Sequence, residues 1–202
     1  MNIRLFPGKK AGPEWLVVFL GNPGRSYEHT RHNAGYLAGD ILSAERHVEL
    51  SREKFRGLYG LTVIGGKKVC LLKPTTYMNL SGESVRAAAD FYKIGPERII
   101  VVLDDINLEP GRLRVRPNGS SGGHKGLQSI IDHMRTDAVA RVRIGVGKPD
   151  TPGFDIADWV LSRMTRSELE RLHPALEKAG KAVEEIIRSG VPAAMEIFNR
   201  AE

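Results

Sequence analysis

The residues best suited to chemistry in this sequence are one histidine, one aspartate and two asparagines. His32 could act as a general base near neutral pH, and the positive end of a helix beginning beside it would favour its neutral, proton-accepting form. Asp104 could hold the other ring nitrogen and stabilise the imidazolium once it forms. The amides of Asn22 and Asn79 donate and accept, so they could orient a carbonyl group or a water molecule. Together these side chains could hydrolyse an ester.

Each of these side chains also has a structural interpretation, which the sequence leaves open. A histidine at a helix start can cap or pack the helix, and the Asp104-Asp105 pair can be a solvated strand end. Asparagines commonly occupy turns and N-caps. The case for a site depends on whether the fold brings the four residues together.

Patterns of apolar residues predict strands that alternate with helices. Continuous apolar runs indicate buried strands, strict alternation a strand with one wet face, and helical spacing a helix. The expected strands are residues 15–20, 98–103, 112–116 and 142–147, with a hairpin at 57–73 that turns at Gly65-Gly66. Three helices are expected in the first part of the chain: one that begins near Ala34, one that runs from about Ser81 to before Gly95, and one at residues 127–134. Towards the C-terminus we expect a capped helical turn at 165–172, which Pro174 interrupts, and then helices at 175–189 and 193–198.

This order of elements predicts a single α/β domain over residues 15–202, preceded by an N-terminal extension at 1–14. Its sheet should be twisted, mixed but mostly parallel, and flanked by helices. Ligands of such folds bind outside the carboxyl ends of the strands. The segment that holds Asn22 and His32 follows one expected buried strand, and Asp104 ends another. We therefore expect these residues to meet at one edge of the sheet.

Composition and charge narrow the class of protein. The chain has 202 residues, 41% of them hydrophobic, and carries a net charge of +6 with a pI near 9.5. The basic segments 51–57, 111–117 and 140–148 favour a nucleic-acid partner, although solubility alone could account for the net charge. No window has the ~20 apolar residues of a membrane helix, and the N-terminus lacks the pattern of a signal peptide. The single cysteine, Cys70, suits a reducing cytoplasm and is most simply a core residue.

Four long motifs occur in a fixed order along the chain: LGNPGRSYEHTRHNAG, KPTTYMNLSG, VLDDINLEPGRLRVRPNGSSGGHKGLQSI and RVRIGVGKP. From about Trp15 to the final helix, the sequence resembles the bacterial peptidyl-tRNA hydrolase family. The resemblance implies a single α/β domain that acts as a monomer, without a metal or other cofactor. It implies a cytoplasmic enzyme that cleaves the ester between a peptide and the terminal ribose of tRNA, which recycles the tRNA of stalled translation.

The resemblance also implies roles for the four candidate residues. His32 corresponds to the catalytic base, which activates a water molecule, and Asp104 to the residue that supports its basic form. Asn22 matches the amide that distinguishes a blocked aminoacyl group from a free one, and Asn79 the residue that orients substrate or water.

Further positions match the family's contacts with tRNA, and two depart from its pattern. Tyr27 and Tyr77 correspond to positions near the tRNA end, where a ring can stack on a base or ribose, and Asn33 follows the histidine as in the family. Lys125 stands where the family commonly has Asn. It can reach a phosphate or a carbonyl group but cannot accept a hydrogen bond. Asn107 replaces a family aspartate, which could loosen a supporting hydrogen bond.

Three other interpretations compete with this one. Residues 119–123 match the G-x-S-x-G pattern of serine hydrolases, with Ser121 as nucleophile, but the preceding segment is cationic rather than a buried strand. His29 and His32 have the spacing of a zinc pair, yet no third ligand stands out in the sequence. A non-catalytic RNA-binding relative is the alternative of another class, because this fold has been reused in plant organelles for intron splicing. RNA binding alone would need neither His32 nor Asp104.

Overall fold

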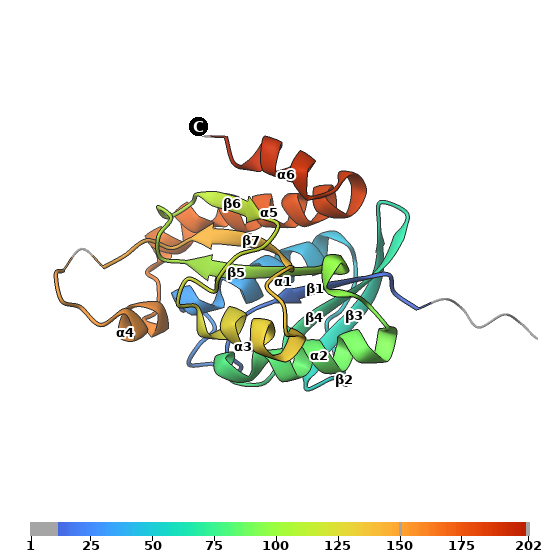
Figure 1. Ribbon diagram of the computed structural model, residues 1–202. Coiled ribbons are helices and arrows are strands. Elements are labelled where there is room, and N and C mark those ends of the chain that lie inside the picture. Colours follow the sequence, from blue (N-terminus) through green and yellow to red (C-terminus); the bar gives the residue numbers. More distant parts are fainter. Residues whose placement is uncertain (1–11, 150, 201–202) are drawn as a thin grey trace, which may run out of the picture.

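The computed structural model describes residues 12–149 and 151–200, which fold into one sheet covered by helices on both faces (Figure 1). In this part of the chain the sheet has seven strands in the order β2-β3-β4-β1-β5-β7-β6. They are β1 Trp15–Phe19, β2 Arg52–Lys54, β3 Gly57–Ile64, β4 Lys67–Pro74, β5 Ile99–Asp105, β6 Leu113–Arg116 and β7 Ala140–Gly145. The central strands β4, β1, β5 and β7 are parallel, whereas β2, β3 and β6 add antiparallel pairs at the two edges. The predicted α/β class with a mixed sheet is confirmed.

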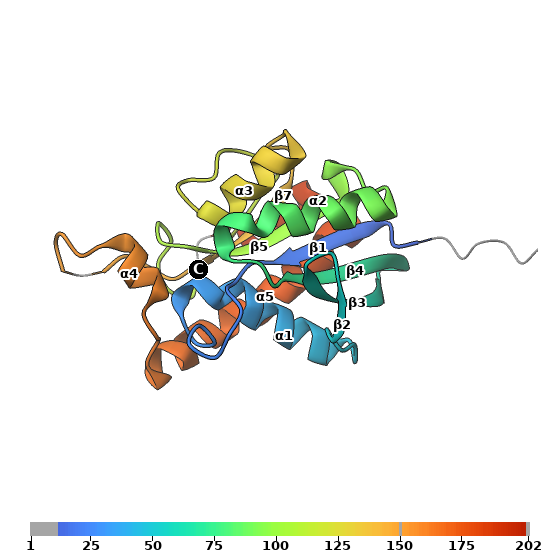
Figure 2. The same cartoon turned by 90° about the horizontal axis from the view of Figure 1, so that it is seen from below.

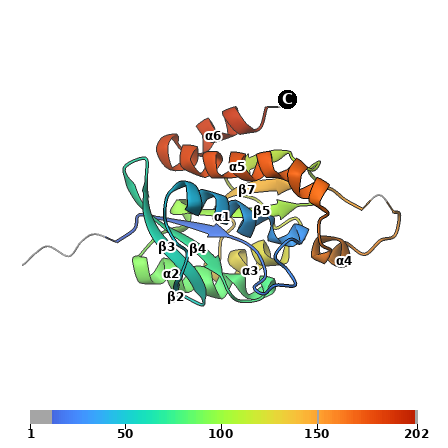
Figure 3. The same ribbon diagram turned by 180° about the vertical axis from the view of Figure 1, so that it is seen from behind.

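The helices form one layer on each face of the sheet. Figure 2 shows α2 and α3 on one side and α1 and α5 on the other, and Figure 3 shows α6 beside α5. The α-helices are α1 Ala34–Glu45, α2 Ser81–Tyr92, α3 Lys125–Met134, α4 Ile156–Leu161, α5 Arg166–Ser189 and α6 Val191–Phe198. Short 3₁₀ helices are η1 Arg31–Asn33, η2 Met78–Leu80 and η3 Pro96–Arg98. No helix in the described ranges combines the length and apolar character needed to cross a bilayer.

The buried strands divide the core into two halves. In β1, Val17 and Phe19 pack into the cluster beneath α1 and α5, whereas Leu16 and Val18 pack into the one beneath α2 and α3. Alternate side chains of a strand point to opposite faces, so a strand covered on both faces needs a continuous apolar run. That is the pattern that predicted β1 and β5 from the sequence.

One glycine brings the segment after β1 close to the sheet. A Cβ added at Gly35 would lie 2.4 Å from the carbonyl oxygen of Leu20 and 2.5 Å from that of Val102. Only glycine therefore allows the start of α1 to rest on the backbone just after β1 and in the middle of β5. As a result η1, which immediately precedes α1, lies beside the carboxyl end of β5.

The structure corrects the prediction for the C-terminal helices. The capped turn expected at 165–172 and the helix expected at 175–189 are one helix, α5, which continues through Pro174. Its start is capped as expected, by a box between Thr165 and Glu168. Proline removes one backbone hydrogen bond, but Leu172 and Ala175 on either side are buried in the core, and their packing outweighs that cost.

Several other elements were missed or fall outside the described residues. Strand β2 and helix α4 were not predicted, because three or six residues give too short a pattern to recognise. The prediction of the hairpin is confirmed, since Gly65 and Gly66 have φ of 55° and 77°, values that suit the two-residue turn. Most of the expected extension at 1–14 lies outside the described residues, which begin at position 12.

Candidate active site

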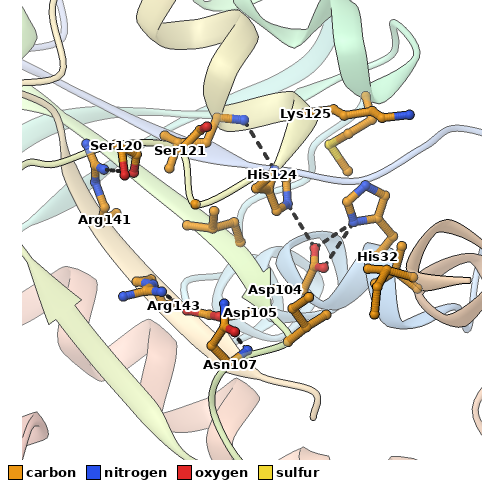
Figure 4. A pocket seen from close by; sticks show the side chains of 18 of the residues that line it. His32, Asp104, Asp105, Asn107, Ser120, Ser121, His124, Lys125, Arg141 and Arg143 are labelled. Carbon is orange, nitrogen blue, oxygen red and sulfur yellow. Dashed lines mark hydrogen bonds and ion pairs between the residues drawn. The ribbon is translucent and has the colours of Figure 1, made fainter. Parts of the chain in front are cut away.

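His32 and Asp104 lie in contact at the carboxyl edge of the sheet, although 72 residues separate them in sequence. Nδ1 of His32 is 3.0 Å from each carboxylate oxygen of Asp104 (Figure 4). His32 is supplied by η1 and Asp104 by the end of β5, and both side chains are buried. The hydrogen bond at Nδ1 leaves Nε2 on the opposite side of the ring. The sequence-based expectation that these two residues meet is confirmed.

The electrostatics of His32 differ from the expectation. Burial lowers the pKa of His32, but the charge of Asp104 and its hydrogen bond raise it more, so the pKa lies above its ordinary value. Lys125 weakly opposes this rise. We expected the helix start to favour the neutral imidazole, which is wrong in net direction because a carboxylate in contact outweighs a helix terminus. The result is a stronger base.

A second imidazole, which the sequence analysis did not single out, contacts the same carboxylate. Nε2 of His124 lies 3.1 Å from Oδ1 of Asp104, and its side chain is only 9% exposed. Burial alone would raise the pKa of Asp104, but the two imidazoles together hold it well below the usual range. In the sequence, His124 lies within the motif VLDDINLEPGRLRVRPNGSSGGHKGLQSI, and in the structure it directly precedes α3 and caps that helix.

Asn22 and Asn33 form a clip that shapes the loop between β1 and η1. The side chain of Asn33 accepts from the backbone N–H of Asn22 at 2.8 Å and donates to its carbonyl oxygen at 3.0 Å. Oδ1 of Asn22 in turn accepts from the backbone N–H of Met78 at 2.9 Å, which ties this loop to η2. Asn33 therefore holds the backbone of Asn22 in place.

A cavity of about 980 Å³ lies at the carboxyl edge of the sheet, and most of the residues predicted from the sequence line it. Of the residues proposed from sequence, its wall includes Asn22, Tyr27, His32, Tyr77, Asn79, Asp104 and Lys125. Tyr77 is 64% exposed, so its ring is available to stack on a ligand. Asn107 also lines the cavity, and its backbone N–H donates to Oδ1 of Asp105 at 2.8 Å.

The arginines on the cavity wall have different roles. Arg141 is buried, and its guanidinium donates to the carbonyl oxygens of Gly119 and Ser120, so it anchors the glycine-rich loop before α3. Arg143 pairs with Asp105. Arg141 and Arg143, in the basic segment 140–148, thus have partners within the protein, so their charges do not by themselves indicate contact with nucleic acid.

Helix α4 supplies an apolar section of the cavity wall, through Ile156, Val160 and Leu161. It is tethered to η1 by Arg31, whose guanidinium lies 3.6 Å from the centre of the Trp159 ring and also pairs with Glu168. The residue next to His32 in the chain therefore fixes an element more than a hundred residues away.

The geometry does not support the competing serine and zinc sites. Ser121 donates to Oε1 of Gln128 at 2.7 Å, and it lies in a loop after an edge strand rather than in a strand-to-helix elbow. Among the described residues, the group of side chains able to hold a metal is His32, Asp104 and His124, without His29. Nδ1 of His32 and Nε2 of His124 lie at hydrogen-bond distance from Asp104. A proton on each of these nitrogens therefore accounts for the arrangement.

Comparisons with known proteins agree with this geometry. A family model described as "Peptidyl-tRNA hydrolase" matches residues 16–202. Similar proteins include the peptidyl-tRNA hydrolases of Clostridium botulinum (strain Eklund 17B / Type B) and Clostridium beijerinckii, which are 50% and 49% identical over 185 residues. Each alignment covers 92% of this chain and 95% of the other protein. The crystal structure of peptidyl-tRNA hydrolase from Acinetobacter baumannii superposes with a TM-score of 0.87 at 36% identity, over 96% of this chain and 99% of that one.

Proposed function

The chain belongs to the peptidyl-tRNA hydrolase family and hydrolyses the ester bond between peptide and tRNA, and we propose that His32 is the general base of this reaction. The observation that carries the proposal is the buried contact between His32 Nδ1 and Asp104, which leaves Nε2 for the proton transfer. The shift of the His32 pKa above its ordinary value supports the same role, since it strengthens the base.

In this mechanism Nε2 of His32 takes a proton from a water molecule as its oxygen attacks the ester carbonyl carbon. Asp104 stabilises the imidazolium that forms and keeps the ring in the orientation with Nδ1–H toward the carboxylate. When the bond to the ribose oxygen breaks, the imidazolium returns the proton to that oxygen. The products are the peptide acid and tRNA with a free terminal hydroxyl.

The cavity wall supplies the contacts that place the substrate. We assign Asn22 to the blocked amino group of the substrate, Asn79 to the water or the carbonyl group, and Tyr27 and Tyr77 to the tRNA end. All four line the cavity that His32 faces. Asn33 acts indirectly, because both of its amide atoms hold the backbone of Asn22.

Cationic side chains are proposed to contact the phosphates of tRNA. Arg116, at the end of β6, and Lys125, in the first turn of α3, line the cavity. Lys125 replaces the family's Asn at a position where a charge adds attraction for the polyanion.

The test compares two substrates on the same protein. The chain is incubated with an N-acetylated aminoacyl-tRNA and with its unblocked counterpart, and the release of free tRNA is followed for the native protein and His32→Asn. We expect turnover of the blocked substrate only, and almost none by the variant. Tight binding without release by the native protein would favour the RNA-binding alternative, and full activity of the variant would exclude His32 as the base.

We also propose that residues 15–202 act as a monomer in the cytoplasm. The buried, unbridged Cys70 suits a reducing compartment, and the substrate is a product of translation. Sedimentation of the full chain should give the mass of one copy, 22.3 kDa.

A further inference from the structure

One carboxylate serves two imidazoles in this site, and only His32 has a role in the mechanism above. Oδ1 of Asp104 lies 3.0 Å from His32 Nδ1 and 3.1 Å from His124 Nε2. The centres of the two rings are 4.8 Å apart, and the carboxylate lies between them and β5 (Figure 4). The three side chains come from η1, β5 and the N-cap of α3, so no single element fixes their arrangement.

The hydrogen bonds of His124 determine where its proton lies. Nδ1 of His124 accepts from the backbone N–H of Leu127 at 3.2 Å, and it must be unprotonated to do so. Nε2 then carries the proton and donates it to Asp104. His124 thus donates to Asp104 from Nε2 and accepts at Nδ1, because a proton on Nδ1 would break the cap of α3.

We propose that His124 is a positioning residue for the hydrolysis, which holds the Asp104 carboxylate in line with His32 and takes up part of its negative charge. A carboxylate that already accepts one N–H stabilises a neighbouring imidazolium less than a carboxylate without that bond. His124 therefore limits how far Asp104 raises the pKa of His32. The inference rests on the proposed role of His32 as general base.

Other charged groups around the imidazoles do not replace this effect. They are Asp105 and Arg143, which pair with each other, Lys125 on α3, and Arg31 and Glu168, which also pair. Of these, only Lys125 contributes to the pKa of His32, and it lowers it. Helix α4 presents apolar side chains to the cavity, and η2 presents the neutral Asn79. Asp104 sets the direction of the shift, and His124 is the group that shares its charge.

Two substitutions separate the donor function of His124 from its capping function. His124→Asn keeps a good N-cap acceptor for Leu127, but its side chain is too short to reach Asp104. His124→Gln is a poor N-cap but has an amide N–H long enough to donate to Asp104. The matched control is His133→Asn, which changes a histidine of the same helix that bonds to the carbonyl oxygen of Ser129, outside the cavity.

The measurement is the pH profile of kcat/KM on an N-acetylated aminoacyl-tRNA, together with an NMR titration of the His32 ring in the full chain. We expect His124→Asn to move both the acid limb and the His32 titration upward by about 0.5–1 pH unit, less than the one to three units that a full neighbouring charge produces. His124→Gln should stay near the native value although its urea midpoint falls, and His133→Asn should change neither profile. Equal profiles for the native protein and His124→Asn, or a shift that follows loss of the cap, would overturn the inference.

The two readouts separate this inference from the proposed function. If the His32 titration moves in His124→Asn while the acid limb stays in place, charge sharing holds but His32 is not the base. If the acid limb follows the His32 titration in the native protein and neither moves in His124→Asn, then His32 is the base and His124 has no positioning role.

Discussion

Ionic clusters lie at the carboxyl ends of β5 and β4, the two parallel strands that flank β1, and only the cluster on β5 is suited to catalysis. On β5, Asp104 contacts the imidazoles of His32 and His124 beside the large cavity. On β4, Lys73 is only 7% exposed and pairs with Asp40 of α1, beside a second hollow of about 590 Å³. Both clusters bury a charge and both border a hollow.

The difference lies in which group titrates and where its remaining atoms point. Burial lowers the pKa of Lys73, while Asp40 and its hydrogen bond oppose that shift. The Lys73 ammonium also lies 4.9 Å from the centre of the Tyr36 ring, so several contacts hold it in place. In the first cluster, an imidazole, the side chain whose ordinary pKa lies nearest to neutral pH, keeps one nitrogen free of the carboxylate. A buried ion pair in a hollow is thus no sign of a site unless one member can change its protonation.

The strongest test of this contrast removes the titrating group. His32→Ala should lower kcat by about 10²–10⁴-fold, the range typical for loss of a general base. The control is His173→Ala, which alters an exposed histidine of α5 that pairs with Glu177. Single-turnover rates on an N-acetylated aminoacyl-tRNA measure the effect, and retention of most of the native rate would show that another group activates the water.

The next test keeps the shape of the cluster and removes its charge. Asp104→Asn should lower kcat by about 10²-fold or more, because an amide does not stabilise the imidazolium. Since Asp104 raises the pKa of His32, its loss should move the acid limb of the kcat/KM profile to lower pH. A limb that stays in place, or moves upward, would contradict the coupling between the two residues.

The sequence was sufficient to predict the first cluster only in part. The apolar runs of β1 and β5 and the position of ligands at strand ends were enough to bring Asn22, His32 and Asp104 together. His124 was missed because the path of the glycine-rich loop depends on Arg141, a distant cation that bonds to its carbonyl groups. No local pattern reports such a contact.

The errors elsewhere have a similar origin in tertiary structure. Local propensity predicts a break at Pro174, but burial on both sides keeps α5 continuous. Arg141 and Arg143 of the basic segment 140–148 bond within the protein, which the charge pattern alone does not show. The wall formed by α4 depends on Arg31 and Trp159, whose separation in sequence hides their contact.

A smaller effect is expected in the second cluster, and it should appear in stability rather than in rate. Asp40→Asn leaves the buried Lys73 without its partner charge and should lower the free energy of unfolding by about 1 kcal/mol, because the exposed side of the pair is screened by solvent. The double variant Asp40→Asn with Lys73→Met should recover part of the loss. Urea titration measures stability, and kcat should stay within about 2-fold of the native value. A loss of kcat in a stable variant would mean that the second cluster also serves the reaction.

The smallest effect distinguishes the two lysines of the two hollows. Lys125 lines the large cavity and lowers the pKa of His32, so Lys125→Asn should move the acid limb slightly upward. The same change should make the dependence of log KM on log salt shallower by about 0.7–0.9, the contribution of one phosphate contact. Lys73→Met should leave both quantities unchanged, since its charge is buried against Asp40. An unchanged salt slope in Lys125→Asn would mean that this cation acts on the imidazole alone and does not contact phosphate.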